Sequence, residues 1–346
     1  MDLRNLSHPV LVTGLTLVLG AVGAGLGWLL NAPVFMLLGP AIMVSLSGLA
    51  GVRTGIDPRL RDLCFVVLGM AVGAGFDAEA LAAMIRWPLA FVFMGMVLWL
   101  ILMLCRVILV RGFRFAPRDA LLAAAPGHLS FVIAMAAETN SDVARISITQ
   151  SVRLLSLTII VPFVALAMGI EVSANVAPQG VTMQAVPLIA LSLSGLALGL
   201  LFKRLSVPAY LLMGAMVSSA VGHLTGWAPG VLPEWIILPA YLVLGALIGT
   251  RFSGVSLHDL RRGLLAGLAV TLVAVTLASA GALPVAWALG MPVAHVLVAF
   301  APGGLETMIA MGAVLGVVPG FVAACHIARL FLLTFLLPAL LARTSP

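Results

Sequence analysis

Two arginines lie inside long apolar segments, where a charged side chain requires a specific partner. Arg153 and Arg329 occupy these positions. On membrane-insertion scales an arginine at the centre of a bilayer costs at least about 2.5 kcal/mol, so each needs a counter-charge or a polar cavity. Two interpretations follow. One is a structural ion pair, with Glu306 and Glu138 as partners. The other is a substrate clamp, because a guanidinium binds a carboxylate or phosphate through two parallel hydrogen bonds.

The polar companions of the two arginines differ. Gln150 precedes Arg153 by three residues, and His326 takes the same place before Arg329. His326 and Glu306 have no titratable counterpart in the first half of the chain. Because the charge of both groups responds to their surroundings, this asymmetry suits proton coupling. The alternative for His326 is a buried histidine that is simply satisfied by its neighbours.

A Pro-Gly break precedes each arginine. The two runs are Ala125-Pro126-Gly127-His128-Leu129-Ser130 and Ala301-Pro302-Gly303-Gly304-Leu305-Glu306-Thr307. Free N–H groups after the break and the positive end of the following short helix suit an anionic group. A packing kink without a ligand is the alternative. The candidate substrate-binding residues are Gly127, His128, Ser130, Gln150, Arg153, Gly303, Gly304, Glu306, Thr307, His326 and Arg329.

The two breaks belong to an internal duplication. Ala125 and Ala301 lie 176 residues apart, and Arg153 and Arg329 are separated by the same distance. Matching Arg, Pro and Gly positions do not follow from hydrophobicity alone. We therefore expect two membrane repeats, 10–170 and 183–343.

Composition places these repeats in a membrane. Of the 346 residues, 62% are hydrophobic and 9% are charged, whereas soluble domains contain about 25% charged residues. Apolar runs of roughly 18 residues or more recur along the chain, which predicts an all-α polytopic membrane protein in contact with the lipid bilayer. The net charge of +6 is read as a topology signal rather than as a nucleic-acid footprint.

The basic residues favour inverted repeats, each with five spans plus a re-entrant Pro-Gly segment. In that arrangement the cationic residues lie on the cytoplasmic side together with the N-terminus, except Arg86 outside and Arg153 and Arg329 within the membrane. This agrees with the positive-inside rule, which six crossings per repeat would violate. A broken helix that does cross is the alternative. The expected location is the bacterial inner membrane.

The sequence offers little for an enzyme. It has no HExxH motif and no cluster of carboxylates or histidines, and its three cysteines are dispersed. We expect no metal, no cofactor, no nucleic acid and no catalytic residues.

The Pro-Gly runs and the duplication resemble the membrane AbrB family, whose members carry a tandem AbrB duplication domain. The Leu-Leu-Gly at 37–39, the glycine segment Leu68–Phe76 and the run Ala301–Met308 support the resemblance. Members are often labelled putative ammonia monooxygenase or AbrB-family regulator. The family is similar in architecture to inverted-repeat antiporters and anion transporters, which implies transport rather than catalysis.

We therefore expect an inner-membrane secondary transporter for a small organic anion or metabolite, with proton coupling as an option. The alternative is a membrane-embedded regulator of gene expression that acts through a partner. The ammonia monooxygenase label is disfavoured. A homodimer is a further expectation, with the glycine-rich segment 10–30 and Val207–Gly226 as candidate interfaces.

Overall fold

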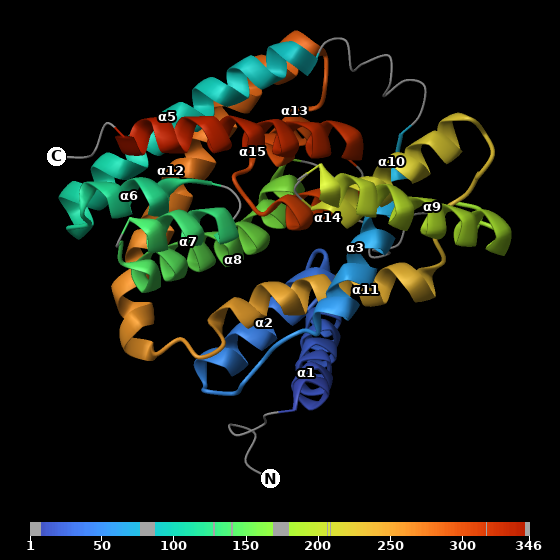
Figure 1. Cartoon of the computed structure of the whole chain (residues 1–346), viewed down its shortest axis with the longest axis horizontal. Coiled ribbons are helices and arrows are strands. Elements are labelled where there is room, and N and C mark those ends of the chain that lie inside the picture. The colour runs from blue at the N-terminus through green and yellow to red at the C-terminus, as the bar shows by residue number, and fades with distance from the viewer. Residues whose placement is uncertain are drawn as a thin grey trace. The chain divides into compact units, whose positions relative to one another are not determined.

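The chain is helical throughout the part described by the computed structural model, which covers residues 8–76, 87–126, 129–139, 141–168, 180–205, 207, 209–315 and 317–342. The side chains at 130, 134, 138 and 319 are outside that description. The elements, shown in Figure 1, are α1 (Pro9–Leu29), α2 (Phe35–Leu49), α3 (Pro58–Gly73), α5 (Trp87–Phe113), α6 (Pro117–Ala124), α7 (Leu129–Glu138), α8 (Val143–Ala167), α9 (Ala185–Arg204), α10 (Tyr210–Leu224), α11 (Glu234–Gly249), η2 (Thr250–Phe252), α12 (Leu257–Leu289), α13 (Val293–Phe300), α14 (Leu305–Val314) and α15 (Pro319–Ala342).

Seven helices within these ranges are long and apolar enough to cross a membrane, namely α1, α5, α8, α9, α11 with η2, α12 and α15. This confirms the predicted polytopic helical class. Helices α2 and α10 have 15 residues each and α3 has 16. At 1.5 Å per residue they measure about 22–24 Å, less than the hydrocarbon thickness of about 30 Å. The prediction that each repeat has five complete membrane spans therefore stays a prediction.

Two helices continue beyond their apolar segments. Helix α5 runs to Phe113, so Arg106 and Arg111 lie on its last turns. Helix α12 continues to Leu289, through Pro284. Apolar patterning locates the membrane part of such helices but gives no signal for where the helix itself stops.

The chain forms two compact units, and each takes helices from both predicted repeats. Unit 1 comprises residues 1–85, 162–254 and 309–321, and therefore contains α1–α3 and α9–α11. Unit 2 comprises residues 86–161, 255–308 and 322–346. The compact units thus do not coincide with the predicted repeats 10–170 and 183–343. The repeat boundaries describe the duplication in the sequence and stay a prediction.

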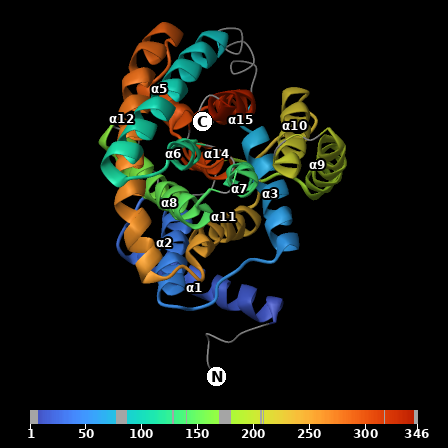
Figure 2. The same ribbon diagram turned by 60° about the vertical axis from the view of Figure 1, so that its left-hand side comes forward.

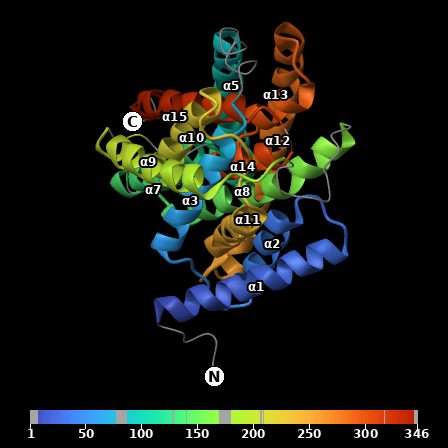
Figure 3. The same ribbon diagram turned by 90° about the vertical axis from the view of Figure 1, so that its right-hand side faces the viewer.

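In unit 1, helices from the two halves exchange equivalent contacts. Helix α3 packs along α10, with α9 on the far side of α10 (Figure 2), and α11 packs on α2, which in turn lies along α1 (Figure 3). A Cβ atom on Gly69 would overlap the Leu212 carbonyl oxygen, and one on Gly245 would overlap the Leu37 carbonyl oxygen. Positions 69 and 245 are 176 residues apart, as in the predicted duplication, and positions 37 and 212 are 175 residues apart. The two contacts are therefore reciprocal, while the repeat organisation itself stays a prediction.

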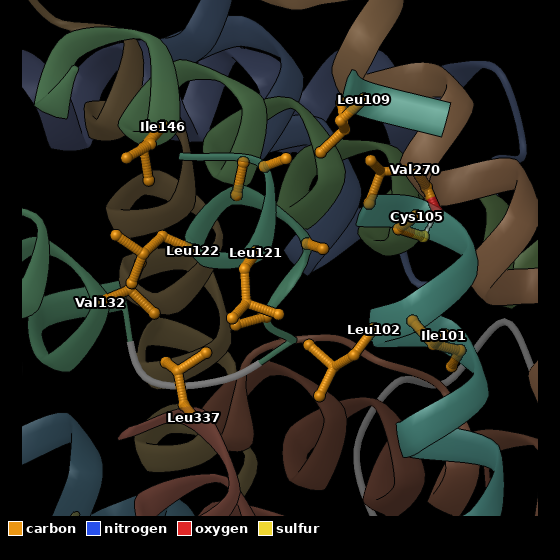
Figure 4. Close-up of a cluster of buried hydrophobic side chains, with 14 of the residues drawn as sticks. Ile101, Leu102, Cys105, Leu109, Leu121, Leu122, Val132, Ile146, Val270 and Leu337 are labelled. Carbon is orange, nitrogen blue, oxygen red and sulfur yellow. Dashed lines mark hydrogen bonds between the residues drawn. The ribbon is translucent and has the colours of Figure 1, made fainter. Parts of the chain in front are cut away.

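In unit 2, a dense apolar cluster surrounds the first Pro-Gly segment. The sequence from Ala120 to Ala125 is fully buried, so the C-terminal part of α6 is enclosed on all sides, whereas its first turn is partly exposed. Figure 4 shows Leu122 of α6, Val132 of α7 and Leu337 of α15 gathered together, while α5 packs along α12 nearby. A helix that is apolar all round is stable only in such surroundings. The cluster fixes α6, and with it the carbonyl groups at its C-terminal end.

The first Pro-Gly segment begins and ends at one end of unit 2. Arg145, in the first turn of α8, donates hydrogen bonds to the carbonyl oxygens of Phe113 (2.5 Å) and Arg114 (3.4 Å), which precede α6. Its guanidinium also lies 3.7 Å from the centroid of the Phe115 ring. If α6 and α7 continued in one direction, their 18 residues would extend about 27 Å, beyond the reach of one side chain. The arrangement is that of a helical hairpin, and whether it re-enters the membrane or crosses it stays a prediction.

Candidate functional site

The Arg329 guanidinium holds the second helix break. Arg329 is 3% exposed on α15. Its Nη1 donates to the Ala301 carbonyl oxygen at 2.9 Å and its Nη2 to the Gly303 carbonyl oxygen at 2.6 Å. Ala301 follows α13, so its carbonyl lies at the negative end of that short helix, where a cation is favoured. The Pro-Gly break frees these carbonyls, and Arg329 satisfies them.

Arg153 holds the first break in a related way, with help from Gln150. Nη1 of Arg153 donates to the Ala125 carbonyl oxygen at 3.2 Å, and Nη2 donates to Gln150 Oε1 at 2.6 Å. Gln150 Nε2 in turn donates to the carbonyl oxygens of Leu122 (2.9 Å) and Ala125 (3.0 Å). The arginine-to-alanine bond spans 28 residues in both halves. Sequence reasoning named Gln150 and Arg153 but attributed no role to these carbonyls.

The two arginines meet at the second break, because Arg329 binds the Gly303 carbonyl and the next residue, Gly304, lies beside Leu154, which follows Arg153. Neither guanidinium forms a salt bridge with a side chain that the structure describes. Among the described residues, the ion pair is the one between Arg61 and Asp62. Within the described residues, the Nε atoms of Arg153 and Arg329 are both buried without a hydrogen-bond partner. A buried cation that lacks an acidic partner is unfavourable, so the two arginines suit an anion.

The tip of the second break lies against the first arginine's helix. A Cβ atom on Gly304 would be 3.5 Å from a methyl group of Leu154, which directly follows Arg153 on α8. Thr307, in the first turn of α14, is buried beside Gly304. The structure therefore brings five predicted site positions together in unit 2: Arg153, Gly303, Gly304, Thr307 and Arg329.

His326 is fully buried, one turn before Arg329. Its Nδ1 lies 2.9 Å from the Val322 carbonyl oxygen, which can only accept, so Nδ1 carries the hydrogen of this bond. Nε2 has no hydrogen-bond partner. The Ala301 carbonyl also lies near the ring, yet outside hydrogen-bonding geometry with Nε2. In the neutral ring Nε2 is a bare acceptor, whereas the equivalent Gln150 makes three bonds.

Glu306 does not pair with either arginine. It is half-buried in the first turn of α14 and forms no salt bridge with a described side chain. The structural ion pair that the sequence left open for Glu306 is therefore not formed, because backbone carbonyls take its place at Arg329. The Glu138 side chain is outside the described atoms.

Three predicted site positions cannot be placed. Gly127 and His128 lie outside the described residues, and the side chain of Ser130, on α7, is likewise outside. For metal ions, the described residues contain no group of three or more His, Cys, Asp or Glu side chains.

Comparison with known proteins gives two matches. A family model described as "Transition state regulatory protein AbrB" matches residues 35–344. A protein of Escherichia coli (strain K12) named "Putative regulator AbrB" is 30% identical over 155 residues, which cover 44% of this chain and 44% of that protein. The matched part thus spans less than half of this relative. Since the family model covers most of the chain, the protein belongs to the AbrB family.

Proposed function

We propose that this protein is a secondary transporter of the bacterial inner membrane and that it moves a small organic anion. The observation that carries the proposal is the pair of buried guanidinium groups without an acidic partner among the described side chains. An ionisable residue inside the membrane is by default a candidate functional residue. An anion between Arg153 and Arg329 would supply the missing counter-charge.

The backbone around the arginines supports the same proposal. Each arginine binds carbonyls at the end of a half-helix. Broken helices at membrane depth are tolerated where they are buried in protein or line a cavity, and in inverted-repeat transporters they form the substrate site. If the first hairpin is re-entrant, the number of predicted crossings per repeat is odd, which would invert the second copy. Two compact units that each draw on both repeats suit a transporter in which one bundle moves against the other.

A proton-coupled mechanism is part of the proposal. His326 is the candidate carrier, because its buried Nε2 is free to accept a hydrogen bond or a proton. Its place beside Arg329 would link the proton to the anion site.

Uptake of labelled anions into proteoliposomes tests the transport function. We expect uptake by the native protein and its loss, to the background of empty liposomes, in Arg329→Ala. Arg329→Lys separates geometry from charge, because lysine keeps the cation but lacks the fork that reaches two carbonyls. It should retain a monodisperse elution profile and lose most of the uptake. Arg111→Lys, at an exposed position on α5, is the matched control and should transport normally. Full uptake by Arg329→Ala would exclude the clamp.

A membrane-embedded regulator is the second candidate, and the names of the family model and of the Escherichia coli relative favour it. It predicts altered gene expression on deletion without flux of any tested anion. An Arg329→Lys allele that restores the expression phenotype but not transport would also favour regulation.

A further inference from the structure

We infer that the substrate is a small dianion with two acidic groups, one for each buried guanidinium. The inference rests on the proposed transport function and specifies its substrate class. Neither arginine has an acidic partner among the described side chains, so a single negative charge between them would leave one buried cation uncompensated. Since an unpaired buried charge is strongly unfavourable, charge balance selects two negative charges over one.

The unused hydrogen-bond donors agree with this charge count. A guanidinium carries five N–H donors in a planar fork. In both arginines the described bonds engage the two terminal nitrogens, once each, and leave Nε–H without a partner. Each guanidinium therefore retains its Nε–H and two terminal N–H donors that the described bonds do not use. A carboxylate can accept hydrogen bonds from two such donors.

A purely structural role of the two arginines explains the bonds of their terminal nitrogens but not the state of their Nε atoms. Pinning the helix break explains why the terminal nitrogens meet the carbonyls of Ala125, Ala301 and Gly303. It leaves the buried Nε atoms without a partner among the described residues. It also leaves two buried cations without an acidic partner among the described side chains. Two acidic groups on one molecule would satisfy both requirements at once, at a lower entropic cost than two separate anions.

Matched acids that differ in charge test the inference. The probes are the four-carbon pair succinate and butyrate, the five-carbon pair glutarate and pentanoate, inorganic phosphate and chloride. The readouts are the thermal midpoint of the purified full-length protein and competition against uptake in proteoliposomes. We expect at least one dianion to bind roughly tenfold or more tightly than its monoanionic partner.

Removing one charge should change this selectivity. In Arg329→Gln and Arg153→Gln the preference for dianion over monoanion should fall toward unity, while Arg329→Lys should keep the preference at weaker overall binding. Arg145→Gln is the matched control: it lies on the same helix as Arg153 and binds backbone carbonyls outside the site, so its ratio should equal that of the native protein.

The outcomes separate the substrate class from the function. Equal or better binding of butyrate and pentanoate, abolished by Arg329→Gln, would overturn the dianion while leaving anion transport intact. Saturable binding of chloride, without competition by any dianion, would likewise overturn the dianion while leaving anion transport intact. Absence of stabilisation and uptake with every anion would overturn the transport function and this inference together. If the glutamine variants fail to fold, the preference for dianion over monoanion in the native protein and in Arg329→Lys still tests the inference.

Discussion

At the scale of single residues, the two halves of the chain use different side chains to bind the backbone carbonyls at a helix break. Both must satisfy carbonyls that a Pro-Gly break has freed. In the first half Gln150 and Arg153 share this work, so that the Gln150 amide is saturated. In the second half Arg329 binds two carbonyls directly, and His326 is left with a free Nε2. Gln150 is therefore structural in character, whereas His326 is available for a ligand or a proton.

Replacement of these two residues should have opposite consequences. Gln150→Leu removes three hydrogen bonds and leaves buried partners unsatisfied, at about 1–3 kcal/mol for each group. We expect a marked fall in the thermal midpoint in detergent. His326→Gln loses one bond to its own helix and places an amide where the first half already uses one, so its midpoint should change little. A larger loss for His326→Gln than for Gln150→Leu would contradict this assignment.

The His326 tautomer gives a direct test. The acceptor at Val322 requires hydrogen on Nδ1. Nitrogen chemical shifts of labelled histidine should therefore identify one ring as the Nδ1–H tautomer, and that signal should vanish in His326→Gln. A predominant Nε2–H tautomer would show that the ring bonds differently.

At the scale of helices, close backbone approach holds the halves of unit 1 together. Small residues let membrane helices approach until their backbones touch, and the gain is van der Waals packing rather than hydrophobic transfer. Gly69 on α3 and Gly245 on α11 are such positions, each against a carbonyl oxygen of the other half. Since the two contacts correspond within the duplication, substitutions at them should behave alike.

Alanine substitution tests these contacts. Gly69→Ala and Gly245→Ala force the helices apart and should each destabilise the protein by about 1–3 kcal/mol. Gly14→Ala on α1 is the control, because a Cβ there meets nothing within 4 Å. It should be neutral or slightly stabilising, since alanine favours helix. Thermal melts in one detergent compare the three. Equal tolerance at all three positions would show that the interface is looser than described.

At the scale of the whole molecule, the topology depends on whether the first helical hairpin re-enters the membrane. If residues before α6 and after α7 lie on one face, the predicted crossings per repeat are odd and the second copy is inverted. The native cysteines are buried, so added cysteines can be labelled over a low background.

Labelling with a membrane-impermeant maleimide tests this topology. Arg111→Cys, near the end of α5, and Asp142→Cys, next to the start of α8, should react from the same face of oriented vesicles. His258→Cys and Ala288→Cys form the control pair. They are exposed near opposite ends of α12, whose 33 residues extend about 50 Å, so they should react from opposite faces. Reaction of the first pair from opposite faces would establish a crossing broken helix.

The sequence by itself determined the membrane class, the Pro-Gly breaks and the arginines that accompany them. These features are readable because apolar length, helix breakers and an intramembrane charge each have a large local energetic cost. It also marked Gln150 and His326 through their spacing from Arg153 and Arg329. Only the tertiary structure decided what these side chains touch. Backbone carbonyls have no sequence signature, so the sequence did not predict the partners at Ala125, Ala301 and Gly303. It offered Glu306 as a possible ion-pair partner instead. The assignment of helices to two units likewise depends on packing between distant segments, which no local pattern encodes.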